Sequence, residues 1–215
     1  LTGAWQLFNS RVDEFPDYGV TGVAARALGS GPSASFASGS ASRLDVHLLS
    51  SPDGGAAILR GDKAETKLDT RGAPGLLIAP FKQGAGSLAV NGEGSLTILG
   101  AEFQNSLAGV RVSNLGIPGA TALVADKWNA AVVGAQVKRL DPQLIIWAFG
   151  VNEGFRNDLN PDSYADTVSA IWKRMAALAP GADTLILGPS DAQRSTGPGV
   201  ECSREWILPP YLHDV

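Results

Sequence analysis

The first 40 residues show only a weak hydrophobic pattern. Apolar side chains from residue 1 to about residue 14 fall near helical spacing, which predicts a helix that Phe15 and Pro16 end. Residues 24–42 are rich in glycine, serine and alanine. This composition favours an irregular linker over an element of the core.

Short apolar runs separated by turn signals fill residues 43–101. The runs lack helical periodicity, and the segments between them carry the Gly, Asn and Asp residues of tight turns. This pattern predicts an antiparallel β-module, either a sandwich or a jelly roll. The predicted strands cover residues 44–49, 56–59, 66–68, 76–79, 88–90 and 96–99.

Strands and helices alternate after Gly100. The predicted strands cover residues 110–113, 144–149 and 184–187. One predicted helix covers residues 121–140, and Asn160 and Pro161 begin another, whose apolar face contains Tyr164, Val168, Ile171, Met175 and Leu178. Residues 144–149 form a continuous apolar run, which indicates a strand buried on both faces. The alternation predicts a parallel sheet with crossover helices, whose ligands bind at the carboxyl ends of the strands.

Composition narrows the possible partners. Seventeen basic against 21 acidic residues give a net charge of −4, and no basic run is suited to a phosphate backbone, so nucleic acid is not expected. The longest apolar run is far shorter than a bilayer, so no transmembrane segment is expected, and any export signal has been removed or lies outside the chain. Cys202 is the only cysteine and is interpreted as structural or incidental. Nucleotide-binding loops and metal-binding helix motifs are absent, so we expect no cofactor and no metal.

Two turns after predicted strands carry candidate chemistry. Residues 114–121 form a glycine-rich turn that enters a helix, where backbone N–H groups could face an anion. Residues 150–154 place Asn152 where its amide could donate to a developing oxyanion. Each turn also has an ordinary interpretation, as a packing turn or an Asx-turn. Their order, at the ends of successive parallel strands, favours the functional one.

These residues resemble two conserved blocks of the SGNH hydrolases, the GDSL-like esterases and lipases. Residues 114–121 resemble the second block, with Gly119 at its glycine, and residues 150–153 resemble the third, Gly-x-Asn-Asp, with Asn152 in place and Glu153 where Asp is commoner. Residues 100–116 resemble bacterial members with a β-module inserted before the second block, which include peptidoglycan O-acetylesterases. The resemblance implies a flavodoxin-like three-layer α/β/α domain with a parallel sheet, plus an inserted antiparallel β-sandwich or jelly-roll module.

The resemblance also implies a division of the chain. Residues 1–40 are expected to form the N-terminal part of the SGNH domain and a linker, residues 41–105 the inserted β-module, and residues 106–215 the remaining, incomplete SGNH domain. The Gly-Asp-Ser and Asp-x-x-His blocks are absent, and neither His47 nor His213 has an Asp three residues before it. The first strand of such a sheet lies in its interior, so we expect a further fragment or chain to supply the missing central strand.

In this family a Ser attacks an ester, a His acts as general base and an Asp orients the His. The resemblance implies that Gly119 and Asn152 are oxyanion donors, and Glu153 and Ser190 are candidates for substrate binding, although a turn residue is the simpler interpretation of Ser190. The leading hypothesis is a carbohydrate O-acetylesterase acting on acetylated cell-envelope polysaccharide, possibly peptidoglycan, in the periplasm or outside the cell. The alternatives are a non-catalytic glycan-binding protein on a degenerate SGNH scaffold, and a lipase or thioesterase of the same fold.

Overall fold

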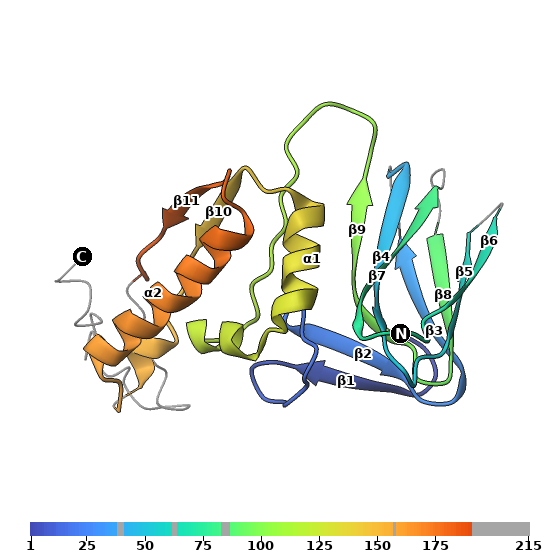
Figure 1. Ribbon diagram of the computed structural model, residues 1–215, viewed down its shortest axis with the longest axis horizontal. Helices are drawn as coiled ribbons and strands as arrows, with labels where there is room; N and C mark the ends of the chain where they lie inside the picture. Colours follow the sequence, from blue (N-terminus) through green and yellow to red (C-terminus); the bar gives the residue numbers. More distant parts are fainter. Residues whose placement is uncertain (38–40, 62–63, 83–86, 157, 191–215) are drawn as a thin grey trace, which may run out of the picture. The chain divides into compact units, whose positions relative to one another are not determined.

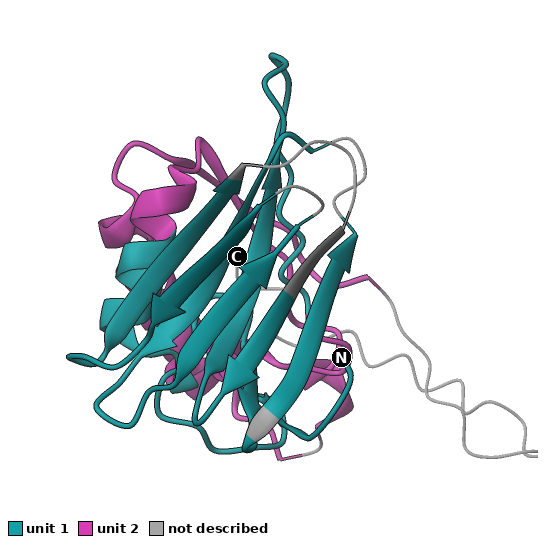
Figure 2. Cartoon of the chain, turned by 90° about the vertical axis from the view of Figure 1, so that its right-hand side faces the viewer, with its two compact units in different colours: residues 1–116, 127–136 teal, residues 117–126, 137–215 magenta. Residues whose placement is uncertain are grey.

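The computed structural model describes residues 1–37, 41–61, 64–82, 87–156 and 158–190 (Figure 1). The chain forms two compact units, coloured separately in Figure 2. Unit 1 contains Leu1–Gly116 and Lys127–Gln136, and unit 2 contains Ile117–Asp126 and Val137–Val215. The described residues before residue 41 belong to the same unit as the strands that follow them. The expected division into an SGNH domain and an inserted β-module, with boundaries at residues 41 and 106, stays a prediction.

Unit 1 is built on two antiparallel sheets. The five-stranded sheet has the order β1-β2-β9-β4-β7, and the four-stranded sheet has the order β3-β8-β5-β6. The strands of the first are β1 (Trp5–Asn9), β2 (Val23–Ala27), β4 (Arg43–Ser50), β7 (Gly75–Lys82) and β9 (Thr97–Gln104). The strands of the second are β3 (Ser30–Ala37), β5 (Ala56–Arg60), β6 (Glu65–Asp69) and β8 (Ser87–Glu93). The six strands predicted between residues 43 and 101 are therefore confirmed.

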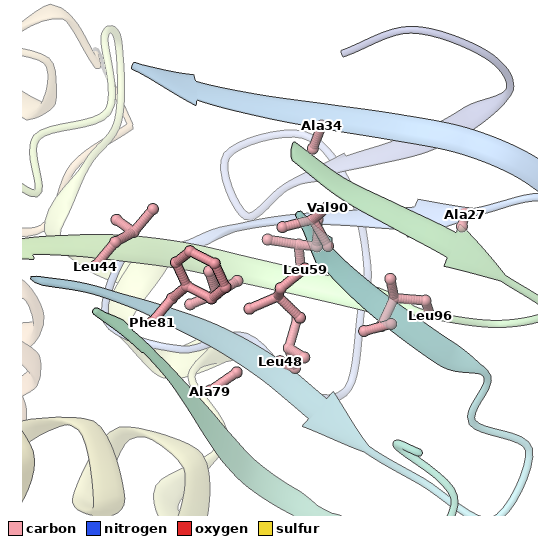
Figure 3. Close-up of a cluster of buried hydrophobic side chains, with 12 residues drawn as sticks. Ala27, Ala34, Leu44, Leu48, Leu59, Ala79, Phe81, Val90 and Leu96 are labelled. Carbon is pink, nitrogen blue, oxygen red and sulfur yellow. The ribbon is translucent and has the colours of Figure 1, made fainter. Parts of the chain in front are cut away.

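The two sheets contribute to one hydrophobic core (Figure 3). Leu44 and Leu48 of β4 meet Leu59 of β5 and Val90 of β8 there, and each of these side chains is at most 1% exposed. A side chain of this size contributes about 1.5–3 kcal/mol on burial. The other face of β4 is covered as well, since Leu49 packs in a second cluster of unit 1 with Phe15, Tyr18, Ala24, Leu99 and Val132.

Two predictions for the first 40 residues are wrong. The expected N-terminal helix is replaced by β1, which pairs with β2 in the register Trp5 with Ala27 through Asn9 with Val23. The expected linker contains β2 and β3, and a register shift between Ser30 and Ser33 interrupts the pairing of β3 with β8. The residue pattern of this segment favours a helix and a linker only weakly. Backbone hydrogen bonds to partner strands determine its structure instead, and those partners cannot be recognised from the local sequence.

Unit 2 contains a strand-helix-strand arrangement close to the predicted one. Strands β10 (Leu144–Trp147) and β11 (Asp183–Ile186) pair in parallel, and helix α2 (Pro161–Leu178) connects them. Asn160 caps α2 through a hydrogen bond from Ser163 N–H to its Oδ1, 3.0 Å long. The cap, the proline at the first turn and the apolar face with Tyr164, Ile171 and Met175 were all predicted.

Other predictions after Gly100 fail locally. Residues 110–113 form no strand, and the side chains of Val110 and Val112 are 92% and 83% exposed. The expected helix over residues 121–140 is divided into a 3-10 helix, η1 (Ala122–Lys127), and α1 (Ala130–Leu140). Asn129 interrupts it, because its side chain accepts hydrogen bonds from Ala131 and Val132 N–H and so begins a new helix.

Strand β10 was expected to be buried on both faces, but part of it is exposed. Leu144 and Ile146 are 52% and 54% exposed, and Leu185 and Ile186 of β11 are 44% and 57% exposed. Within the described residues β10 pairs only with β11, so this parallel sheet has two strands in that part of the chain. None of the described helices is long and apolar enough to cross a membrane.

Candidate functional site

The turn that carries Gly119 lies at the start of unit 2. Ala120 N–H donates to the Ile117 carbonyl at 3.0 Å, which places Pro118 and Gly119 at the two central positions of a β-turn. Gly119 has a φ of 76°, as the second central residue of a type II turn requires. A proline followed by a glycine therefore determines this turn locally, and Gly119 is exposed at its tip.

The second candidate loop follows β10. Gly150 has a φ of 123°, and a Cβ at this position would lie 2.8 Å from Cγ of Pro189. Pro189 follows β11, so the loops at the carboxyl ends of both parallel strands contact each other here. Only glycine satisfies both the positive φ and this close approach. The chain then turns into a short 3-10 helix, η2 (Glu153–Phe155).

Asn152 joins the two turns. Its side-chain Nδ2 donates a hydrogen bond to the Ala120 carbonyl at 2.8 Å, and the side chain is partly buried. An amide nitrogen carries two N–H groups, so this bond orients the amide and leaves the other N–H for a ligand oxygen. This hydrogen bond joins the loop that carries Asn152 to Ala120, the residue that follows Gly119 in the chain, and the role of Gly119 and Asn152 as oxyanion donors stays a prediction.

Glu153 does not lie where a substrate-binding residue is expected. Its side chain is 1% exposed, and its carboxylate accepts hydrogen bonds from Ala122 N–H, Gly150 N–H and the Tyr164 hydroxyl. A carboxylate buried among donors of its own chain supports the loops and has no surface to offer a substrate. The expected role in substrate binding is corrected to a structural one.

The remaining candidates have different outcomes. Ser190 is exposed four residues beyond the end of β11, and its expected contact with substrate stays a prediction. His47 is a buried strand residue of unit 1, and its Nδ1 lies 3.0 Å from Nε2 of Gln136. Cys202 and His213 lie outside the described residues. Over the described ranges, no three His, Cys, Asp or Glu side chains are grouped as metal ligands.

Tyr164 was missed as a residue of the site. The sequence indicated only that it belongs to the apolar face of α2, where it is indeed buried. Its hydroxyl, however, donates to Oε1 of Glu153 at 2.9 Å. No local signal identifies such a contact, because the partner lies eleven residues away in a different element.

Comparison with known families identifies the chain. The sequence model of the GDSL-like Lipase/Acylhydrolase family matches residues 82–209. The chain belongs to this family. The matched residues include both turns described above, so the predicted resemblance to SGNH hydrolases is confirmed. No curated protein matches the sequence.

Solved structures resemble the chain to different extents. A peptidoglycan O-acetylesterase is 23% identical with a TM-score of 0.67, over 91% of this chain and 55% of that one, so this chain spans about half of its length. A family 6 carbohydrate-binding module is 10% identical with a TM-score of 0.31, over 49% of this chain and 85% of that one. A family two carbohydrate esterase from Clostridium thermocellum in complex with cellohexaose is 10% identical with a TM-score of 0.29, over 90% of this chain and 79% of that one. Only the first likeness is close enough to show a shared fold.

Proposed function

We propose that this chain forms the oxyanion-binding part of a serine ester hydrolase that removes O-acetyl groups from carbohydrate. The observation that carries the proposal is the hydrogen bond from Asn152 Nδ2 to the Ala120 carbonyl, which joins the Asn152 loop to the Gly119 turn. Membership of the GDSL-like Lipase/Acylhydrolase family supports the class of reaction.

In the proposed reaction a Ser hydroxyl attacks the ester carbonyl and passes its proton to a His. The carbonyl oxygen becomes an oxyanion, which accepts hydrogen bonds from Gly119 N–H and from the second amide N–H of Asn152. Collapse of this intermediate expels the sugar alcohol, which takes the proton from His, and water then hydrolyses the acyl-Ser to acetate. Each oxyanion donor typically contributes about 3–4 kcal/mol to stabilising the transition state.

The Ser and the His are proposed to come from a segment outside residues 1–215, which also adds a strand to the parallel sheet. The exposed apolar side chains of β10 and β11 support this part of the proposal. A parallel pair is normally covered on both faces, and its free edges present unpaired N–H and C=O groups. The three-layer α/β/α layout, with unit 1 as an inserted β-module, belongs to the same proposal.

The proposed substrate is an acetylated cell-envelope polysaccharide, with peptidoglycan as the first candidate. The shared fold with a peptidoglycan O-acetylesterase supports this choice. Such a substrate implies that the protein works in the periplasm or outside the cell. We propose no cofactor, because the reaction needs only a nucleophile, a base and oxyanion donors.

The test measures acetate release from O-acetylated peptidoglycan by the full-length gene product. Asn152→Ala should lower kcat about 100-fold or more, since one oxyanion donor is lost. Asn105→Ala is the matched control, because it removes an amide from an exposed loop of unit 1. Ester cleavage that Asn152→Ala leaves unchanged would contradict the proposed site. Glycan binding without any ester cleavage would favour the non-catalytic alternative.

A further inference from the structure

Glu153 is a buried carboxylate that the proposed reaction does not use. It lies within unit 2 and is 1% exposed. A charged group in this environment is costly unless hydrogen bonds replace its lost hydration. The position therefore calls for an explanation in terms of its partners.

The partners of Glu153 come from both candidate turns and from α2. Oε1 accepts from Ala122 N–H at 2.6 Å and from the Tyr164 hydroxyl at 2.9 Å. Oε2 accepts from Gly150 N–H at 3.1 Å. Ala122 begins η1 directly after the Gly119 turn, and Gly150 begins the Asn152 loop. One carboxylate thus connects the backbone segments that carry the two proposed oxyanion donors.

We propose that Glu153 is a positioning residue that sets the separation between the Gly119 turn and the Asn152 loop. This inference rests on the proposed function, because it assigns the two segments to one oxyanion site. Hydrogen bonds to a carboxylate are stronger than those to a neutral acceptor, so the connection is stiff. Catalytic donors must be held within about 0.5 Å of the productive geometry, so a stiff connection between the two segments would favour catalysis.

The Tyr164 hydroxyl and the charge of Glu153 can each be removed by a separate substitution. Glu153→Gln keeps the shape of the side chain but replaces one acceptor oxygen with an NH2 group, which then faces a backbone N–H donor. Tyr164→Phe removes only the hydroxyl that donates to Oε1 of Glu153. Both variants act on the same carboxylate, so their effects should combine less than multiplicatively.

The experiment compares steady-state kinetics of the full-length gene product and its variants on a chromogenic acetyl ester. Glu153→Gln should lower kcat about 10- to 100-fold while KM stays within about threefold, because misplaced donors weaken transition-state binding more than substrate binding. Tyr164→Phe should lower kcat less than Glu153→Gln does. The fold-decrease of kcat in the double variant should be smaller than the product of the two single fold-decreases. Asp166→Asn, an exposed carboxylate on the same helix as Tyr164, should change neither constant.

Amide hydrogen exchange provides a readout that does not need activity. Glu153→Gln should speed exchange at Gly150 and Ala122 at least tenfold more than Asp166→Asn does, with unfolding temperature as the check on the overall fold. Unchanged exchange at both amides, or equal kinetic losses in Glu153→Gln and Asp166→Asn, would overturn the positioning role. If Glu153→Gln does not fold, Tyr164→Phe decides by the same exchange measurement at Ala122. A wild-type protein that cleaves no ester would refute the proposed function. The exchange rates at Gly150 and Ala122 would still show whether Glu153 holds the two backbone segments together.

Discussion

Burial of Tyr18 in unit 1 changes the acidity of its hydroxyl. The side chain is 0% exposed, and this burial, together with the nearby carboxylates of Asp13 and Glu14, raises the pKa of Tyr18 to about 12. Burial and negative neighbours both disfavour the phenolate, so the folded protein holds this proton more tightly than the unfolded chain. The resulting stabilisation is fully present below the ordinary pKa of 10.0 and is lost as the pH rises towards 12.

Tyr18→Phe should therefore make the free energy of unfolding fall less steeply above pH 10. The measurement is denaturant unfolding at several alkaline pH values, with ultraviolet absorbance following phenolate formation. The wild-type protein should show a phenolate transition near pH 12 that Tyr18→Phe lacks. A complete tyrosine titration near pH 10 in the folded wild-type protein would contradict the prediction.

At the scale of single elements, α2 depends on its first turn. Asn160 Oδ1 accepts from Ser163 N–H at 3.0 Å, and Pro161 occupies the first turn. The same turn places Tyr164 against Glu153, so the start of this helix also affects the candidate site.

Asn160→Ala should lower the free energy of unfolding by about 1 kcal/mol, because the N–H of Ser163 loses its acceptor. Asn160→Ser should retain most of the stability, since serine caps helices equally well. Urea denaturation of the three proteins measures the difference. Equal stability of the alanine and serine variants would show that the cap does not stabilise α2.

At the scale of the whole molecule, the two units differ in how completely they bury their strands. The sheets of unit 1 share a core of side chains that are nearly inaccessible to solvent. In unit 2, by contrast, apolar side chains of β10 and β11 are between 44% and 57% exposed at Leu144, Ile146, Leu185 and Ile186. Unit 1 therefore buries its apolar strand residues in a closed core, whereas the parallel strands of unit 2 leave several apolar side chains at the surface.

The proposed additional strand makes a prediction about solubility. A protein limited to residues 1–215 should bind a hydrophobic fluorescent dye and self-associate more than the full-length gene product, because its apolar strands stay exposed. Dye fluorescence and light scattering at equal concentrations measure both effects. Replacing Ile146 with Thr in the shorter protein should reduce dye binding. Identical behaviour of the shorter and longer proteins would contradict the additional strand.

Several features were determined by the sequence itself, because their causes are local. The strands between residues 43 and 101 follow from short apolar runs between turn residues, and α2 follows from its cap, its proline and its apolar spacing. The Gly119 turn follows from a Pro-Gly pair, whose backbone preferences need no distant partner. Family membership likewise followed from two short blocks of residues.

Other features were decided only by the tertiary structure, because their causes are contacts between distant residues. Residues 5–9 are a strand because β2 offers them hydrogen-bond partners, whereas residues 110–113 have no such partner among the described strands and form none. The sequence placed Glu153 beside Asn152 but could not show that its carboxylate turns inward to Ala122 and Tyr164. Neighbouring residues determine the local preference of the backbone. The direction of a buried polar side chain depends instead on which hydrogen-bond donors the fold places around it.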